Sequence, residues 1–508
     1  MAPEAGASLL AAWATGGALS FVVEAGALPR PRAPWRRPVH ALAVHLSVWT
    51  AAYATLLALL ARPWFAAALA LAALLVVVLV GRAKFDALRE PFVCQDFEYF
   101  TDALRHPRLY LPFLGWWRLL GALLACAGAF WAGLVLEPPH FDGGASARAS
   151  AVLGCFAVGV GALCAARAAS ARLDTSWVAQ RDVRAWGLVA SLWRYGSQAR
   201  QLPALAPPFA GLPLHLPARA EALPDLVTVQ SESFFDARES YACLRADLLP
   251  RYDALRAQAL AHGRLAVPAW GANTIRTEFA FLTGLEEAAL GVHRYQPYQR
   301  LAASGVATIA SRLREAGYRT VCVHPYHGTF YGRDRLMPLL GFDQFIDGAA
   351  FAGAAREGAY VGDVALASFV TGLLRAERDR PLYVHVITME NHGPLHWERV
   401  TAQDRDDVAG VPLPEGCDEL VAYARHLRHA DSMLGMLADA LAAQPRDSGL
   451  CFFGDHVPIM PAAYRLLGEP PGHTHYLAWS PRRPGGGDAR DLRASALARD
   501  FLARMGMC

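Results

Sequence analysis

The first third of the chain is a series of long apolar stretches that contain few charged residues. The most uniform of these stretches are residues 40–61, 63–80, 109–136 and 151–169. A helix of about 20 apolar residues crosses the roughly 30 Å hydrocarbon core of a bilayer, and buried helices of soluble proteins seldom reach that length in series. Residues 7–28 form a fifth stretch, diluted by glycine and Glu24, that is either a spanning helix or an uncleaved signal-like anchor. The pattern predicts a transmembrane helical domain of about five spans in residues 1–170.

The pattern changes after residue 170. Residues 171–222 mix apolar and polar positions and then become rich in proline, which predicts an amphipathic connector followed by a stiff linker. In residues 223–508, short apolar runs alternate with stretches of helical periodicity, which indicates an α/β domain whose sheet is covered by helices on both faces. The apolar runs are residues 226–229, 320–323, 382–387 and 450–453, and the helical stretches are residues 308–316, 364–375 and 417–441.

Four polar signatures lie near the ends of apolar runs in this second region. They are Ser-Glu-Ser at 231–233, Asn-Thr at 273–274, Asn-His at 391–392 and Gly-Asp-His at 454–456. Ligands of open α/β sheets bind at the carboxyl ends of the strands, so these signatures are expected to converge. Glu232, Asp455 and His456 would offer oxygen and imidazole ligands to one divalent cation. Each residue taken alone fits a helix cap, a surface charge or a structural histidine.

Thr274 is the candidate nucleophile, because it follows a glycine-containing turn and precedes a predicted helix. A hydroxyl bound to a metal loses its proton readily, and the amino end of a helix favours an anionic phosphate. The simpler role for Thr274 is a helix N-cap. Thr277 is a competing candidate that lies further from Gly271.

Arg333 and His392 are candidates for donating hydrogen bonds to phosphate oxygens in a transition state, although each is equally compatible with a structural role. A pocket for a head group is predicted around residues 324–331, where two histidines and two tyrosines are crowded together. His473 and His475 form another cluster, which is a weaker candidate for holding or supporting a metal.

Composition excludes some classes of function. The content of hydrophobic residues is 54% and that of charged residues only 18%, which is unusual for a wholly soluble protein. The net charge of +3 is too small, and the basic residues too dispersed, to indicate nucleic acid as a partner. The nine cysteines include no CxxC pair and indicate neither a disulfide framework nor a zinc knuckle.

Taken together and in this order, the helical bundle and the motifs resemble the lipoteichoic acid synthase-like, sulfatase-domain membrane transferases of the alkaline phosphatase superfamily. The resemblance covers almost the whole chain and implies an α/β sulfatase/alkaline-phosphatase-like domain with a mixed, mostly parallel sheet. The implied metal ligands are Glu232, Thr274, Asp455 and His456, the implied phosphate-binding residues are Arg333 and His392, and the implied pocket residues are His324 and Tyr331. Thr274 is also the implied nucleophile.

The resemblance implies a transferase that moves a phosphoglycerol head group from a phosphatidylglycerol-type lipid, through a phosphothreonine, to a cell-envelope glycan or glycolipid. It implies one divalent metal ion, usually manganese, with zinc or magnesium as alternatives. Sulfatases proper need a Cys or Ser in a C/S-x-P-x-R motif, whereas here Thr274 is followed by Ile275 and Arg276, so sulfate hydrolysis is not expected. The resemblance also implies a bacterial cytoplasmic membrane protein whose catalytic domain lies outside.

The chain departs from the family at two positions. Tyr331 stands where polymerising synthases typically have Trp, and Met460 stands where they have a hydroxyl residue that helps to hold glycerol. The head group and the acceptor therefore stay open, with a phosphoethanolamine transferase, a phosphodiesterase and a noncatalytic glycan-binding protein as alternatives. The arginines at 30–37 and 82–108 favour the opposite orientation in the membrane by the positive-inside rule.

Overall fold

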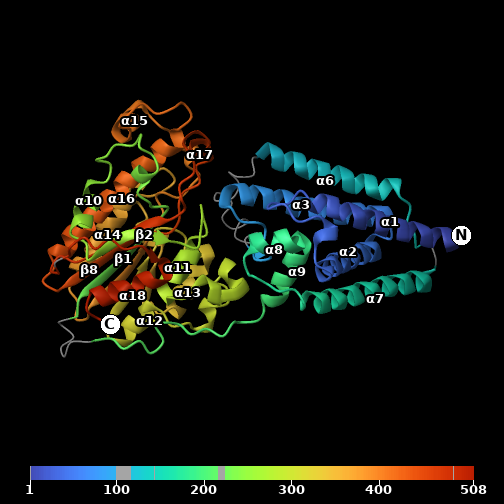
Figure 1. The fold of residues 1–508 in the computed structure, drawn as a ribbon, viewed down its shortest axis with the longest axis horizontal. Helices are drawn as coiled ribbons and strands as arrows, with labels where there is room; N and C mark the ends of the chain where they lie inside the picture. The colour runs from blue at the N-terminus through green and yellow to red at the C-terminus, as the bar shows by residue number, and fades with distance from the viewer. Residues whose placement is uncertain (1, 99–115, 142–143, 216–222, 484) are drawn as a thin grey trace. The chain divides into compact units, whose positions relative to one another are not determined.

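The computed structural model describes residues 2–98, 116–141, 144–215, 223–483 and 485–508. The chain divides into two compact units, Met1–Gln201 and Leu202–Cys508 (Figure 1). The first unit is helical, and the second is built around a β-sheet.

The first unit contains the long apolar helices. They are α1 (Ala2–Glu24), α2 (Val39–Leu60), α3 (Pro63–Leu88), α6 (Trp116–Leu136) and α7 (Ala145–Ser170). Among the described residues, four segments are long and apolar enough to cross a membrane, and these lie in α1, α2, α3 and α7. Four of the predicted stretches are therefore confirmed as long apolar helices, and the number of spans stays a prediction. The predicted span at residues 109–136 lies partly outside the described residues, and α6 covers the remainder.

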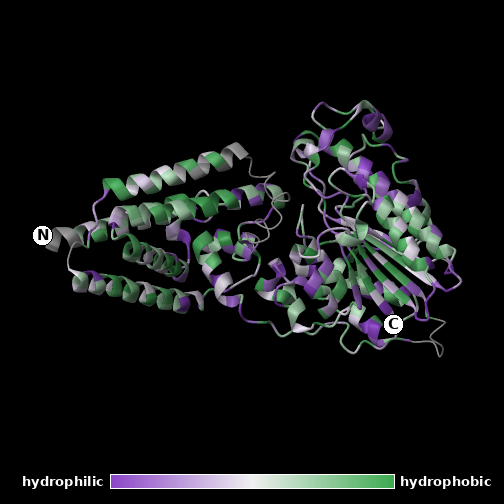
Figure 2. Ribbon diagram, turned by 180° about the vertical axis from the view of Figure 1, so that it is seen from behind, coloured by the Kyte–Doolittle hydropathy of each residue, from purple (hydrophilic) through white to green (hydrophobic). Residues whose placement is uncertain are grey.

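Hydrophobic residues predominate along these helices (Figure 2), and many of their large apolar side chains are exposed. Leu10 is 67% exposed and Leu59 is 72% exposed, although both belong to highly apolar helices. A water-soluble bundle would bury such side chains, whereas a bilayer solvates them. The first unit is therefore an integral membrane domain.

Two shorter helices, α8 (Ala179–Trp186) and α9 (Leu188–Gln198), complete the first unit. The backbone N–H of Val189 at the start of α9 donates to the Glu24 carboxylate at 2.8 Å, and Arg37 forms a buried ion pair with the same carboxylate. The acidic residue at the end of α1 is thus neutralised within the unit. Residues 216–222 of the predicted linker lie outside the described residues.

The second unit contains an eight-stranded sheet in the order β10-β2-β9-β8-β1-β7-β3-β4. Its strands are β1 (Asp225–Ser231), β2 (Ala261–Ala266), β3 (Arg319–Val323), β4 (Gln344–Ile346), β7 (Leu382–Ile387), β8 (Ser448–Gly454), β9 (Thr474–Trp479) and β10 (Leu492–Arg493). The five strands from β8 to β4 are parallel, β9 is antiparallel to β8 and β2 is antiparallel to β9. The predicted mixed, mostly parallel sheet is confirmed. Two short strands, β5 (Arg356–Glu357) and β6 (Tyr360–Val361), form a separate hairpin.

Helices cover both faces of this sheet (Figure 1). One face packs against α10 (Pro250–Ala257), α14 (Asp363–Arg375) and α16 (Asp418–Ala442), and the other against α11 (Thr274–Thr283), α12 (Ile309–Glu315), α13 (Arg333–Leu339) and α18 (Ala494–Arg504). Successive side chains of a strand point to opposite faces, so Val227 joins the first core and Leu226 the second. Burial on both faces explains why the central strands are continuous apolar runs. Outside these layers lie α15 (Ala402–Val408) and α17 (Pro461–Leu467).

The carboxyl ends of β8, β1, β7 and β3 lie side by side at one edge of the sheet. The register pairs Ser231 with Gly454, Gln230 with Ile387 and Val323 with Val386. Residues that follow these strands therefore emerge at the same edge, where ligands of open α/β sheets bind.

Candidate metal centre

Three of the predicted ligands meet at this edge. Nε2 of His456 lies 3.4 Å from Oε1 of Glu232 and 3.4 Å from Oδ2 of Asp455, and all three residues are buried. Ligand atoms bound about 2.1 Å from one tetrahedral cation are about 3.4 Å apart. The spacing therefore fits coordination of a single ion.

Backbone contacts fix the orientation of Asp455. Its Oδ1 accepts hydrogen bonds from the backbone N–H groups of Ser233 at 2.8 Å and His456 at 2.9 Å. Its Oδ2 is buried and has no hydrogen-bond partner among the described residues. A buried carboxylate oxygen without a partner is costly unless a cation completes its surroundings. The chain therefore offers an oriented ligand atom where a metal ion fits.

A close backbone approach brings the two strand ends together. A Cβ atom added at Gly454 would lie 1.8 Å from the carbonyl oxygen of Phe234, so only glycine fits at this position. Ser233 adopts a left-handed φ of 55°, and its hydroxyl donates to Oε1 of Glu232 at 2.9 Å. The segment after β1 is thus bent toward the segment after β8.

The electrostatics of the cluster also favour a cation. Burial and the neighbouring Glu232 raise the pKa of Asp455 to about 7. Burial opposes protonation of His456, but Asp455 and Glu232 raise its pKa above the usual value. Nδ1 of His456 donates to the carbonyl oxygen of Val457 at 3.1 Å, which leaves the Nε2 lone pair directed at the carboxylates. Two buried carboxylates and one imidazole therefore fit a divalent ion.

Thr274 is the first residue of α11, and its Oγ1 lies 3.5 Å from Nε2 of His456. Asn273, immediately before it, has a left-handed φ of 68° that turns the chain into the helix. The hydroxyl of Thr277 instead donates to the backbone carbonyl of Asp455 at 2.7 Å. The structure thus brings the four predicted ligands together and gives Thr277 a structural contact. The amino end of α11 supplies a favourable field for an anion.

Arg333 is held in a buried polar group of its own. Its Nη2 donates to Oε2 of Glu278 at 2.6 Å and its Nε to Oε1 at 3.2 Å, while Nη1 lies 3.3 Å from Nε2 of His324. Its guanidinium carbon lies 5.3 Å from the centre of the Tyr331 ring. These contacts use three of its five N–H groups.

His324 is neutral in this arrangement. Burial and the neighbouring Arg333 lower its pKa well below the usual value. Its Nδ1 lies 3.1 Å from the carbonyl oxygen of Ile387 and donates to it, so Nε2 accepts from Arg333. The structure therefore places His324 as a support for the arginine.

His392 is half-buried after β7, and its Nδ1 lies 2.8 Å from the carbonyl oxygen of Gly393. The hydroxyl of Tyr360 lies 3.4 Å from the same nitrogen. Burial, Tyr326 and the carboxylate of Glu232 raise the pKa of Tyr360. Sequence reasoning missed Tyr360, because Tyr360 comes from the short β6 strand, and it assigned no role to Glu278.

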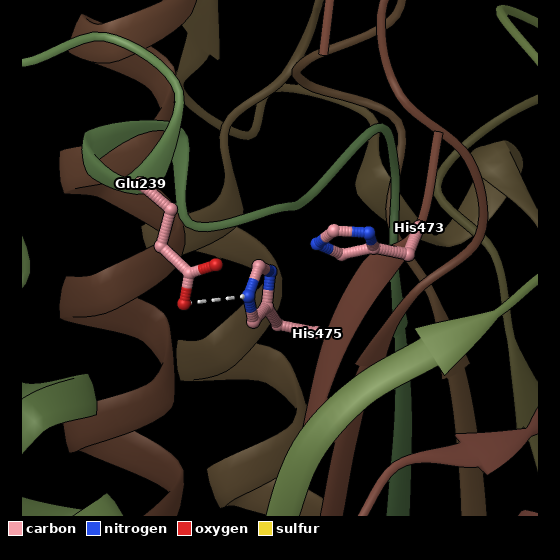
Figure 3. A group of neighbouring side chains, drawn as sticks. All are labelled: Glu239, His473 and His475. Atoms are coloured by element: carbon pink, nitrogen blue, oxygen red, sulfur yellow. Dashed lines mark ion pairs between the residues drawn. The ribbon is translucent and has the colours of Figure 1, made fainter. Parts of the chain in front are cut away.

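Figure 3 shows the second histidine cluster, which consists of Glu239, His473 and His475. Nδ1 of His475 accepts the backbone N–H of Asp236 at 2.9 Å, so a neutral ring carries its proton on Nε2. That nitrogen lies 3.3 Å from Oε1 of Glu239. With Nε2 protonated, His475 offers no lone pair to a metal, and the geometry does not favour a cation here.

A helix-covered, mostly parallel sheet with candidate metal ligands at its carboxyl edge is the arrangement of the sulfatase/alkaline-phosphatase-like fold. The Sulfatase family matches residues 224–506, and the chain belongs to that family. This confirms the sulfatase-domain resemblance.

Two of the three similar proteins reported below match more of this chain than its catalytic domain. The capsular polysaccharide biosynthesis protein RkpI of Rhizobium meliloti is 28% identical over 86% of this chain and 82% of its own length. Lipoteichoic acid synthase 1 of Bacillus subtilis is 23% identical over 31% of this chain and 24% of its own length. The lipooligosaccharide phosphoethanolamine transferase A of Neisseria meningitidis, an integral membrane protein, superposes over 91% of this chain and 88% of its own, with a TM-score of 0.54 at 13% identity. The last likeness shows that the fold of both units is shared.

Proposed function

We propose that this enzyme transfers a phosphoglycerol head group from a phosphatidylglycerol-type membrane lipid to a hydroxyl of an envelope glycan or glycolipid. The observation that carries the proposal is the Thr274 hydroxyl, placed at the amino end of α11 and facing Glu232, Asp455 and His456. A relative named for capsular polysaccharide biosynthesis and another named a lipoteichoic acid synthase support an envelope glycan as the acceptor.

Glu232, Asp455, His456 and Oγ1 of Thr274 would hold the metal ion. Bound there, a divalent cation lowers the pKa of the threonine hydroxyl and neutralises phosphate oxygens. The mixture of three oxygen donors and one nitrogen donor suits manganese, zinc or magnesium better than a thiophilic ion, and manganese is the expected one.

The reaction proceeds in two displacements at phosphorus. Oγ1 of Thr274 forms a bond to the phosphorus of the lipid, the bond from phosphorus to the diacylglycerol oxygen breaks, and that oxygen takes up the proton. The oxygen of an acceptor hydroxyl then forms a bond to the phosphorus of the phosphothreonine, the bond from phosphorus to Oγ1 of Thr274 breaks, and Oγ1 takes up the proton of the acceptor. Arg333 and His392 hold the nonbridging oxygens, and the amino end of α11 stabilises their charge.

Among the described residues, four helices are long and apolar enough to cross a membrane, which supports a membrane lipid as the donor. We assign the protein to the bacterial cytoplasmic membrane, with residues 223–508 outside the cytoplasm, where glycan acceptors of this kind are located. Fusions of a periplasmic reporter enzyme to residue 508 are expected to be active, and activity only of cytoplasmic reporters would reverse the orientation.

A phosphoethanolamine donor is the second candidate, favoured by the shared fold with the lipooligosaccharide phosphoethanolamine transferase A. Water in place of a glycan acceptor would make the chain a phosphodiesterase that uses the same threonine. The first displacement separates the two donors, because the head group remains on the protein.

The deciding experiment is intact-mass analysis after incubation with manganese and either phosphatidylglycerol or phosphatidylethanolamine. Wild-type protein is expected to gain a glycerol phosphate at Thr274, and Thr274→Ser, which keeps the hydroxyl, is expected to gain the same adduct. Thr274→Ala is expected to gain none and to lose transfer. An ethanolamine phosphate adduct would show that the donor is phosphatidylethanolamine. Full transfer by Thr274→Ala would refute the mechanism.

A further inference from the structure

A single histidine binds both ends of the segment that carries His392. The segment runs from Glu390 to Glu398, directly after β7. Nδ1 of His426, in α16, lies 2.6 Å from Oε1 of Glu390, and its Nε2 lies 2.8 Å from Oε2 of Glu398. The side chains of His426 and Glu390 are completely buried, and that of Glu398 is 14% exposed.

The contacts define the protonation of His426. A neutral imidazole has one N–H group, whereas here both ring nitrogens face carboxylates, which only accept hydrogen bonds when ionised. Both nitrogens therefore donate, and the ring is a buried imidazolium. Burial opposes this charge, but the hydrogen bonds to Glu390 and Glu398 raise the pKa of His426 to about 9. Burial would raise the pKa of Glu390, but the hydrogen bonds from His426 and His429 outweigh this effect and lower it to about 2.

Glu390, His426 and His429 also have the composition of a metal site. Their ligand atoms are only 2.5 and 2.6 Å apart, compared with 3.4 Å in the cluster around His456. Such short separations are those of charge-assisted hydrogen bonds rather than of two ligands on one ion. Glu390, His426 and His429 are therefore held together by hydrogen bonds and not by a metal ion.

Other groups complete the charge balance around His426. His429 lies 2.5 Å from Oε1 of Glu390, and the backbone N–H of Asp363 donates to Oε2 at 2.6 Å. Arg425 pairs with Glu398 at 2.6 Å. The side chain of Asp363 is buried beside Glu390, and burial with that neighbour raises its pKa well above the usual value. His426 is the buried cation between the two carboxylates.

We infer that His426 is a positioning residue, which holds the two ends of the 390–398 segment and thereby fixes the place of His392. The inference rests on the proposed function only through the role of His392 on phosphate. His426 itself lies on α16 and acts on His392 only through its contacts with Glu390 and Glu398.

Hydrogen exchange tests the structural half of the inference in the full-length protein. His426→Gln removes the charge and one of the two donors, so amides of residues 390–398 are expected to exchange at least tenfold faster, while those of β1 keep their rate. His396→Gln is the matched control, because His396 is an exposed residue of the same segment. Unchanged exchange in His426→Gln, or a uniform acceleration that includes β1, would overturn the inference.

A double-mutant cycle tests the functional half, with manganese-dependent hydrolysis of bis(p-nitrophenyl) phosphate as the assay. His426→Gln is expected to lower kcat roughly tenfold to a hundredfold with little change in KM, because it displaces a group aimed at the transition state. In a His392→Ala background the same change is expected to cost less than about twofold, since the two residues act as one unit. Independent, multiplicative losses would contradict the inference.

This assay does not depend on the identity of the lipid donor, so a wrong donor in the proposed function leaves the cycle intact. If wild-type protein hydrolyses no phosphodiester, the proposed chemistry fails, and the exchange experiment still decides the role of His426. The metal content of His426→Gln is also measured and is expected to equal that of wild type. The loss of an ion in this variant would show that Glu390, His426 and His429 bind a metal, and would overturn the inference.

Discussion

At the scale of single residues, the two carboxylate oxygens of Asp455 have different roles. One carboxylate oxygen is fixed by two backbone N–H groups, and the other faces Glu232 and His456 in a buried site. The sequence indicated the ligand set because Gly-Asp-His follows an apolar run. It did not indicate Tyr360, because Tyr360 contacts His392 through a tertiary contact that leaves no local motif.

The pH dependence of stability tests this site. In metal-free protein the pKa of Asp455 is about 7 when folded, above its ordinary value of about 3.9 when unfolded. The folded state therefore binds more protons between these pH values, so its stability falls as the pH rises through this window. Thermal unfolding of metal-stripped protein at pH 5 and pH 7.5 is expected to show this fall, and Asp455→Asn is expected to reduce it.

The affinity for the metal ion is expected to depend on pH in the opposite direction to the stability of metal-free protein, because the ion binds only the ionised carboxylate. Manganese affinity is expected to increase as the pH rises through about 7, measured by titration calorimetry. In the thermal unfolding of metal-stripped protein, an equal loss of stability between pH 5 and pH 7.5 in Asp455→Asn and wild type would show that Asp455 is not the titrating group.

At the scale of secondary structure, the predicted elements were those with the strongest patterns. The runs at 226–229, 320–323, 382–387 and 450–453 became β1, β3, β7 and β8, because parallel strands buried on both faces are uniformly apolar. The strands β2, β4, β9 and β10 of the same sheet were not predicted. In β2 and β9 apolar residues are mixed with histidine and other polar residues, and β4 and β10 have only three and two residues. Periodicity carries little information for such short or partly exposed strands.

The carboxyl end of β8, which precedes the candidate metal ligands Asp455 and His456, is expected to tolerate few substitutions. Gly454→Ala would place a methyl group 1.8 Å from the carbonyl oxygen of Phe234, so we expect a loss of roughly 1–3 kcal/mol in the free energy of unfolding, together with lost metal binding. Gly372→Ala in α14 is the matched control, because nothing lies within 4 Å of the added atom. In that helix the change is expected to stabilise by roughly 0.5–1 kcal/mol. Denaturant unfolding measures both, and equal effects would contradict the argument.

At the scale of the whole molecule, the two units have separate hydrophobic cores. The two largest core clusters draw only on residues 205–508, and the three smaller ones only on residues 9–193. The division between an apolar helical region and an α/β region was visible in the sequence, because composition alone changes there. The pairing order of the strands was not, since it depends on contacts between distant segments.

Separate cores lead to a prediction about the isolated catalytic unit. Residues 202–508 expressed alone are expected to unfold in one cooperative transition and to bind about one manganese ion per chain. Glu232→Gln in the same fragment is expected to abolish the bound ion without loss of the transition. Elemental analysis and calorimetry check both, and an aggregated or unstructured fragment would show that the catalytic unit depends on the membrane unit.

The bond between strand ends has a consequence for how long the enzyme persists. Ser233 and Asp455 are 222 residues apart in the chain, yet one hydrogen bond joins the segments that carry Glu232 and His456. A cation shared by these segments would act as a reversible crosslink that closes a very long loop, and the unfolded chain cannot form it. Metal scarcity would then shorten the lifetime of the folded protein as well as stop its turnover, so that the supply of the ion would regulate abundance and activity together.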